Sequence, residues 1–121
     1  MNDQPPTRTV IVVEDDDSVR RSMQLLLHWQ GFDVRSYPNV ARVLSGEDID
    51  TARILVADYR LPDGDGIGVL TALRKRGWHG RAFMITGHHT PDLERAALSC
   101  GYVAVLQKPL RHHELLGLLG R

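Results

Sequence analysis

The hydrophobic positions follow two alternating patterns along the chain, and this alternation predicts the fold class. Runs of consecutive apolar residues, rich in β-branched side chains, are typical of strands buried on both faces of a sheet. Apolar residues spaced three or four positions apart are typical of helices that bury one side. The runs predict strands at residues 9–13, 54–58, 82–86 and 102–107, and the alternation of apolar and polar residues over 32–37 predicts a fifth strand.

A helical stripe of apolar residues follows each predicted strand, and a glycine ends each of the first four. The stripes are Val19, Met23, Leu26 and Leu27 before Gly31; Val40, Val43 and Leu44 before Gly46; Ile67, Leu70 and Leu73 before Gly77; Leu93, Ala96 and Ala97 before Gly101; and Leu115, Leu116, Leu118 and Leu119. Asp16 or Asp17, Asn39 and Thr90 stand where helix N-caps are expected. Five alternations of strand and helix predict one α/β domain whose parallel sheet is covered on both faces.

Composition and charge narrow the class of protein. The 121 residues carry 15 Lys and Arg against 15 Asp and Glu, so no net charge attracts the chain to nucleic acid or to a membrane surface. Residues 1–8 contain two prolines and few apolar groups, so we expect a loose leader before a domain over residues 9–121. A signal-peptide core, a membrane-length apolar run and a second cysteine beside Cys100 are all missing, so we expect a cytoplasmic location.

Polar side chains stand where four of the five predicted strands end. Glu14 and Asp15 follow the first strand, Asp58 ends the third, Thr86 ends the fourth and Lys108 follows the fifth. The same ends of parallel strands meet at one edge of a sheet, where ligands bind in open α/β folds. Carboxylates gathered there repel one another unless a cation joins them, and Mg²⁺ accepts one or two carboxylates together with phosphate oxygens. The set predicts a magnesium site beside a carboxylate that can attack a phosphoryl group.

Each of these features also has an ordinary explanation when it is taken alone. An acidic run after a strand suits the start of a helix, because its charge complements the helix dipole. Asp58 could open a turn through its own backbone, and a Lys-Pro pair is usual in loops. Only their occurrence at successive strand ends favours a site.

The segments VVEDDDSVR, DYRLPDGDG, MITGH and KPL, in this order, make residues 10–119 similar to the receiver domains of two-component response regulators. The resemblance implies a flavodoxin-like, doubly wound sheet of five parallel strands in the order 2-1-3-4-5. It implies that Asp58 accepts a phosphoryl group from a histidine kinase or a histidine phosphotransfer protein. It also implies that Thr86 and Lys108 act on that group, and that the Lys108–Pro109 peptide is cis.

The resemblance further implies how Mg²⁺ is held. Asp15 and Asp58 are expected to be direct ligands, Glu14 to act through a water molecule, and the backbone carbonyl of Arg60 to be the third protein ligand.

The chain departs from the family at three positions. Val105 stands where many receivers carry an aromatic residue that couples to the threonine, so the signal is expected to travel by another route. Gly87 replaces the usual alanine after Thr86. Arg60 and His88 flank the expected path of an attacking water, and we hypothesise that Arg60 slows loss of the phosphoryl group.

The function implied is a signalling switch that alters a partner or dimer surface at about residues 90–119. We expect a stand-alone regulator that binds no nucleic acid itself, or alternatively the receiver segment of a DNA-binding transcription regulator. A Mg²⁺-dependent phosphohydrolase with an aspartyl-phosphate intermediate is less favoured, because Arg60 stands where its acid/base carboxylate is needed. Trp29 and Trp78 lie near predicted helix ends and are expected to serve packing.

Overall fold

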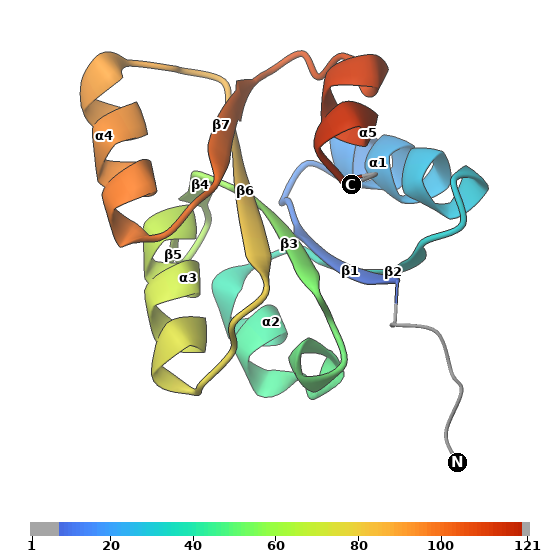
Figure 1. The fold of residues 1–121 in the computed structure, drawn as a ribbon, viewed down its shortest axis with the longest axis horizontal. Helices are drawn as coiled ribbons and strands as arrows, with labels where there is room; N and C mark the ends of the chain where they lie inside the picture. The colour runs from blue at the N-terminus through green and yellow to red at the C-terminus, as the bar shows by residue number, and fades with distance from the viewer. Residues whose placement is uncertain (1–7, 120–121) are drawn as a thin grey trace.

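Residues 8–119 are described by the computed structural model, and they form three layers with a parallel sheet in the middle (Figure 1). The leader predicted for residues 1–8 lies, apart from Arg8, outside the described residues. The sheet order is β2-β1-β3-β6-β7. Its strands are β1 (Thr9–Val13), β2 (Asp33–Tyr37), β3 (Ile54–Asp58), β6 (Arg81–Thr86) and β7 (Ala104–Gln107). Counted without the short strands β4 (Arg60–Leu61) and β5 (Gly64–Asp65), this is the predicted order 2-1-3-4-5.

Helices cover both faces of the sheet, as the alternation of patterns predicts. Helices α1 and α5 lie on one side, and α2, α3 and α4 lie on the other (Figure 1). Their bounds are Asp17–Trp29 for α1, Val40–Ser45 for α2, Gly66–Lys75 for α3, Pro91–Cys100 for α4 and His112–Leu119 for α5, with a short 3₁₀ helix at Asp48–Asp50. No helix of these described residues is both long and apolar enough to cross a membrane.

The two faces of the sheet bury separate hydrophobic cores, which explains why the strands read as unbroken apolar runs. Ile11 and Val13 of β1 point into the core beneath α2, α3 and α4. Val10 and Val12, the alternate residues, point into the core beneath α1 and α5. All four side chains are fully buried, as expected when successive residues of a strand face opposite layers.

Local side-chain chemistry sets the ends of the helices. The side chains of Asp16, Asn39 and Thr90 accept hydrogen bonds from backbone N–H groups in the first turns of α1, α2 and α4, which confirms the predicted caps. Gly31 and Gly101 follow α1 and α4 with positive φ, the conformation that glycine adopts without steric cost.

The structure differs most from the predicted strand boundaries at the start of β7, whereas β2 and β6 begin one residue away from their predicted starts. We predicted a strand from residue 102, but β7 begins at Ala104. The N–H group of Tyr102 donates to Ala97 O and so closes the end of α4, which leaves this residue outside the strand ladder. The strand therefore starts only after the helix has been capped.

The two tryptophans lie in different environments, one buried and one exposed. Trp78 packs in the core as expected and donates its indole N–H to Ala52 O at 2.9 Å. Trp29, at the end of α1, is 80% exposed, so the expectation that it serves packing is wrong. Trp29 is the last residue of α1, two positions after Leu27. At about 100° per residue its side chain points away from the face that buries Met23 and Leu27.

Candidate functional site

The strand register brings the predicted polar residues to one level at the carboxyl edge of the sheet. Val13 of β1 pairs with Ala57 of β3, so Glu14 and Asp58 are the next residues on neighbouring strands. Asp58 pairs with Ile85, one residue before Thr86. Thr86 in turn pairs with Gln107, one residue before Lys108. The predicted convergence of the strand ends is confirmed.

Lys108 links two of the carboxylates. Its ammonium donates to Asp58 Oδ2 at 2.8 Å and forms an ion pair with Glu14 Oε2 at 2.7 Å. Burial acts to lower the pKa of Lys108, but its contacts with the two carboxylates outweigh burial and raise this pKa. The lysine therefore stays charged at neutral pH.

Glu14 is the most deeply buried charged group of the site. Its side chain has no exposed surface, and burial raises its pKa to about 7, with the charge of Asp58 acting in the same direction. The contact with Lys108 and the hydrogen bond from Asp16 N–H at 3.1 Å offset only part of this effect. One ammonium for several buried or neighbouring carboxylates leaves an excess of negative charge that a cation would neutralise.

The carboxylates have the chemistry and spacing of a site for a hard cation. Glu14, Asp15 and Asp58 each offer an oxygen, and these oxygens lie within 4.8 Å of one another. Asp15 is exposed while the other two are buried, so the cluster opens to solvent on the side of Asp15. All three ligands are carboxylate oxygens, which suits Mg²⁺ better than a metal that prefers nitrogen or sulfur. The residues present therefore fit the predicted ion.

Arg60 contacts the site through its backbone. Its N–H group donates to Asp58 Oδ1 at 3.3 Å, and its side chain is exposed. The ligand role of its carbonyl stays a prediction. Asp58 therefore receives one hydrogen bond on each oxygen, from Arg60 and from Lys108, which fixes the plane of the carboxylate.

Thr86 is buried next to these groups and is held by two backbone contacts. Its hydroxyl accepts a hydrogen bond from His88 N–H at 3.1 Å, and its carbonyl accepts one from Lys108 N–H at 2.8 Å. The following Lys108–Pro109 peptide is cis, as the resemblance implies. The ends of β6 and β7 are thus tied together at the site.

Arg20 of α1 is a site neighbour that the sequence pattern did not single out. Its guanidinium donates to Glu14 O at 2.8 Å and pairs with Asp17 at 2.5 Å. The only sequence signal for this arginine is its spacing of three residues from Asp17 on a helix.

Tyr102 is a second missed residue, and it reaches the site from the far side of the core. Its buried hydroxyl donates to Gly66 O at 2.5 Å. Gly66 N–H donates to Tyr59 O at 2.8 Å, and a Cβ at position 66 would lie 2.8 Å from Asp58 O. Tyr102 and Gly66 are 36 residues apart, so no local pattern could have indicated the contact. It connects the approach to β7 with the loop that follows Asp58.

Comparison with known proteins places this geometry in a family. The model of the response regulator receiver domain matches residues 10–119. Nodulation protein W of Bradyrhizobium diazoefficiens is 36% identical over 107 residues, which cover 88% of this chain and 47% of that protein. Transcriptional regulatory protein FixJ of Azorhizobium caulinodans is 35% identical over 106 residues, covering 87% of this chain and 50% of that protein.

Solved structures agree on the fold. A response regulator receiver domain protein from Methanospirillum hungatei superposes with a TM-score of 0.85 at 22% identity, covering 94% of this chain and 91% of that one. The chain spans about half the length of the curated relatives that it matches. Receivers of this kind are phosphoacceptor signalling domains rather than classical enzymes, and they bind Mg²⁺ at an acidic pocket. This chain belongs to the receiver domain family of two-component response regulators.

Proposed function

We propose that this chain is a phosphorylation-dependent switch that accepts a phosphoryl group on Asp58. The observation that carries the proposal is the contact of Lys108 with both Asp58 and Glu14, beside a third carboxylate within 4.8 Å. The most buried of these carboxylates, Glu14, gains a second cationic partner when Mg²⁺ binds.

The chemistry follows from the positions of the side chains. A carboxylate oxygen of Asp58 attacks phosphorus while the bond between phosphorus and the donor atom breaks, so the phosphoryl group is transferred without a net redox change. A bound Mg²⁺ would supply positive charge to the phosphoryl oxygens. Lys108 exchanges part of its contact with Asp58 for a contact with the transferred group, and Thr86 offers a hydroxyl donor beside it. The donor is a histidine kinase or a histidine phosphotransfer protein.

In this proposal Arg60 limits loss of the phosphoryl group, and the side chains of Arg60 and His88 flank the path of the attacking water. Both side chains are exposed, and each lies two residues beyond a group of the site, Asp58 or Thr86. Arg60→Ala is expected to lose the phosphoryl group faster, while Arg95→Ala, on the exposed side of α4, serves as the control. An unchanged rate of loss in Arg60→Ala would remove this role.

The output surface covers about residues 90–119. Leu98 and Val103 are exposed there at 45% and 52%, and apolar side chains of this size suit a partner or a second copy of the chain. With Val105 in place of an aromatic residue, the hydrogen bond from Tyr102 to Gly66 offers another connection between the loop of Asp58 and this surface.

The test is the intact mass of the protein after incubation with acetyl phosphate and Mg²⁺. One added phosphoryl group is expected, and it is expected to disappear when Mg²⁺ is removed by EDTA or when Asp58 is replaced by Asn. An adduct that persists in Asp58→Asn would assign the reaction to another residue. A folded wild-type protein that gains no adduct, even when the sample is trapped within seconds, would overturn the proposal.

A second candidate concerns the protein in which this domain works. Two of the relatives described above are named a nodulation protein and a transcriptional regulatory protein, and the chain matches about half of each. This favours the alternative that the domain controls a transcription regulator over the expectation of a stand-alone regulator. An immunoblot of the native protein tests it: a species about twice the length of this chain supports the regulator, and one of 121 residues overturns it.

A further inference from the structure

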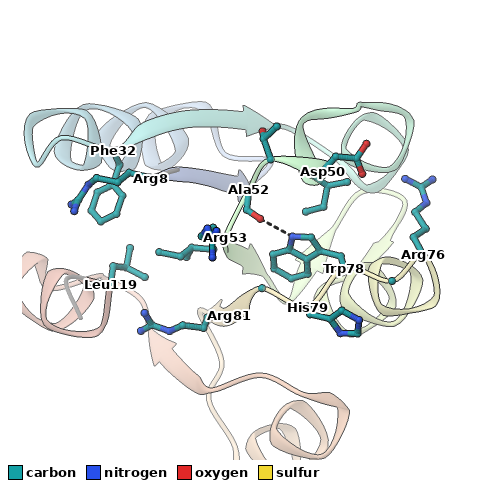
Figure 2. A pocket seen from close by; sticks show the side chains of 15 residues that line it. Arg8, Phe32, Asp50, Ala52, Arg53, Arg76, Trp78, His79, Arg81 and Leu119 are labelled. Carbon is teal, nitrogen blue, oxygen red and sulfur yellow. Dashed lines mark hydrogen bonds between the residues drawn. The ribbon is translucent and has the colours of Figure 1, made fainter. Parts of the chain in front are cut away.

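A hollow of about 760 Å³ lies at the amino edge of the sheet, opposite to the carboxylates. Figure 2 shows the side chains that line it, and cations are prominent among them. Arg8, Arg53 and Arg81 are grouped on one side of it, and Arg76 and His79 lie towards Trp78. Among the described residues that line the hollow, Asp50 is the only acidic one.

The backbone places three of these arginines at the starts of three neighbouring strands. Arg8 precedes β1, Arg53 precedes β3 and Arg81 begins β6, and β3 lies between the other two strands in the sheet. Arg53 N–H donates to Thr9 O at 3.1 Å, and Arg81 N–H donates to Arg53 O at 2.9 Å. Val10 and Arg81 both pair with Ile54, so Arg8 and Arg81 are each one residue out of register with Arg53, and the three side chains start near one another without being paired across the sheet. Like charges in this arrangement repel one another.

Neutral groups orient the two outer arginines. The Arg8 guanidinium lies 4.3 Å from the centroid of the Phe32 ring, and that of Arg81 lies 5.2 Å from the centroid of Phe83. Arg8 also donates to Gln30 O at 3.4 Å, and Arg81 donates to Leu118 O at 2.5 Å. For Arg8, whose printed contacts are a ring and a carbonyl, the positive charge of the guanidinium is left uncompensated within the described residues.

Arg53, the central arginine, is exposed and makes no side-chain hydrogen bond or ion pair within residues 8–119. None of the ion pairs formed in that part of the chain involves Arg8 or Arg76 either. The positive charges of Arg53, Arg8 and Arg76 are therefore available to a ligand.

The floor of the hollow is apolar. Ile49, Ala52, Ile54 and Trp78 are buried beneath it. The indole N–H of Trp78 is already bonded to Ala52 O, as Figure 2 shows, and the residue is 8% exposed, so the ring offers a ligand a narrow apolar edge but no spare donor. A ligand that suits the hollow combines several negative charges with an apolar or planar part.

We propose that this hollow binds a small organic phosphate of the nucleotide type. Phosphate oxygens contact Arg53, with Arg8 beside it, because guanidinium groups bind phosphate through paired hydrogen bonds. The planar part lies on the floor beside Trp78. The volume is within the range of about 300–1,000 Å³ that small-molecule sites occupy. A bounded hollow on a chain with no net charge suits one small molecule better than an extended nucleic acid.

Fluorescence can measure this binding directly, because the chain has two tryptophans and only Trp78 lines the hollow. Trp29→Phe leaves Trp78 as the single reporter. ADP is titrated in EDTA, so the carboxylate site holds no Mg²⁺ and the result is independent of phosphorylation at Asp58. We expect a saturable change in Trp78 emission and an affinity at least tenfold weaker in Arg53→Met. Arg95→Met, which removes an exposed arginine from α4, is expected to bind ADP as tightly as its parent.

Four results would overturn the proposal. The first is no saturable change in Trp78 emission up to about 10 mM ADP. The second is an equal loss in Arg95→Met and Arg53→Met, which would indicate unspecific attraction. The third is a ligand with only part of ADP that binds as tightly as ADP. Equal binding of adenosine would remove the role of the arginines, and equal binding of pyrophosphate would remove the role of the apolar floor. The fourth is polyglutamate binding more tightly than ADP, which would assign the edge to an acidic protein.

Thermal unfolding gives a second readout that does not depend on fluorescence. ADP is expected to raise the Tm of the wild type and leave that of Arg53→Met unchanged, because a ligand stabilises only the state that binds it. Arg53→Met is expected to fold, since its side chain is exposed, and to melt slightly higher than the wild type at low salt because the central charge is gone. An equal rise of Tm with ADP in both proteins would contradict the proposal.

Discussion

The two edges of the parallel sheet carry opposite charges, and these charges are held in opposite ways. At the carboxyl edge, Glu14 and Asp58 are buried and share the ammonium of Lys108 at 2.7 and 2.8 Å. At the amino edge, Arg8 and Arg53 extend from neighbouring strands without any carboxylate partner in the described part of the chain. The chain has equal numbers of basic and acidic residues, 15 of each, but acidic side chains gather at one edge of the sheet and basic side chains at the other.

The length of the side chains explains the difference. A short carboxylate at the end of a buried strand cannot reach bulk water, so it needs a partner where it stands. A long arginine can rest its stem and its planar face on an aromatic ring and still keep its charge in solvent. The carboxyl edge is consequently a tightly coupled cluster, and the amino edge tolerates the loss of a charge. Substitutions at the two edges should separate these behaviours.

The largest effect is expected from Lys108→Met at the carboxyl edge. Loss of the only ammonium that contacts both Glu14 and Asp58 should slow phosphorylation by acetyl phosphate about 100-fold, as when a charged donor to a reacting group is removed. The rate is measured by intact mass over time. Arg53→Met removes a cation from the opposite edge and should leave the rate unchanged. Similar rates in both variants would contradict the difference between the edges.

Gly66→Ala tests how closely the loop of Asp58 is packed. The new Cβ would lie 2.8 Å from Asp58 O, so the backbone must shift, and we expect a loss of about 1–3 kcal/mol in the free energy of unfolding. Urea unfolding in EDTA measures it.

Gly68→Ala is the matched control, because Gly68 lies two residues after Gly66 in the same helix, α3. Its Cβ would meet only Asp65 Oδ1 at 3.5 Å, an ordinary contact, and alanine favours a helix by about 0.5–1 kcal/mol over glycine. Stabilisation of both variants would show that the contact with Asp58 O relaxes without cost.

Tyr102→Phe tests the connection from the approach of β7 to the same loop. Removing the hydroxyl leaves the carbonyl of Gly66 without its buried donor, which typically costs about 1–2 kcal/mol. Tyr59→Phe is the control, because the Tyr59 hydroxyl makes no side-chain hydrogen bond within residues 8–119. The free energy of unfolding of both variants is measured in urea. Equal values would show that the hydrogen bond from Tyr102 to Gly66 does not stabilise the fold.

The smallest effect is expected from Asp63, which lies in the loop between β4 and β5. The N–H groups of Val40 and Ala41 donate to its carboxylate and lower its pKa below the ordinary 3.8. The ionised form is therefore favoured by folding: the stabilisation is present above pH 3.8 and is lost as the pH falls through the lower, folded-state pKa.

Asp63→Asn should consequently melt slightly below the wild type at pH 7, and the two Tm values should approach each other under acidic conditions. Glu47→Gln, an exposed acid without these contacts, should show no such trend. A difference in Tm between Asp63→Asn and the wild type that stays constant with pH would contradict the assignment.

Much of the fold could be predicted because its signals are local. The strands at residues 9–13 and 54–58 were predicted with the observed bounds, since each is an unbroken apolar run with a polar residue at its end. The caps at Asn39 and Thr90 were predictable because an N-cap bonds a backbone group only three residues away. The start of β7 was not predictable in this way. The N–H group of Tyr102 bonds to Ala97 O at the end of α4, and this contact outweighs the strand propensity of tyrosine.

The sequence by itself determined which residues meet at the carboxyl edge, because parallel strands of known ends must bring Glu14, Asp58 and Lys108 together. Only the tertiary structure decided how these groups share charge, which depends on burial and on distances of a few ångströms. It also decided the contact of Tyr102 with Gly66 and the row of arginines at the amino edge. Such contacts join residues that are tens of positions apart, and the packing of helices and strands, rather than any local pattern, sets their geometry.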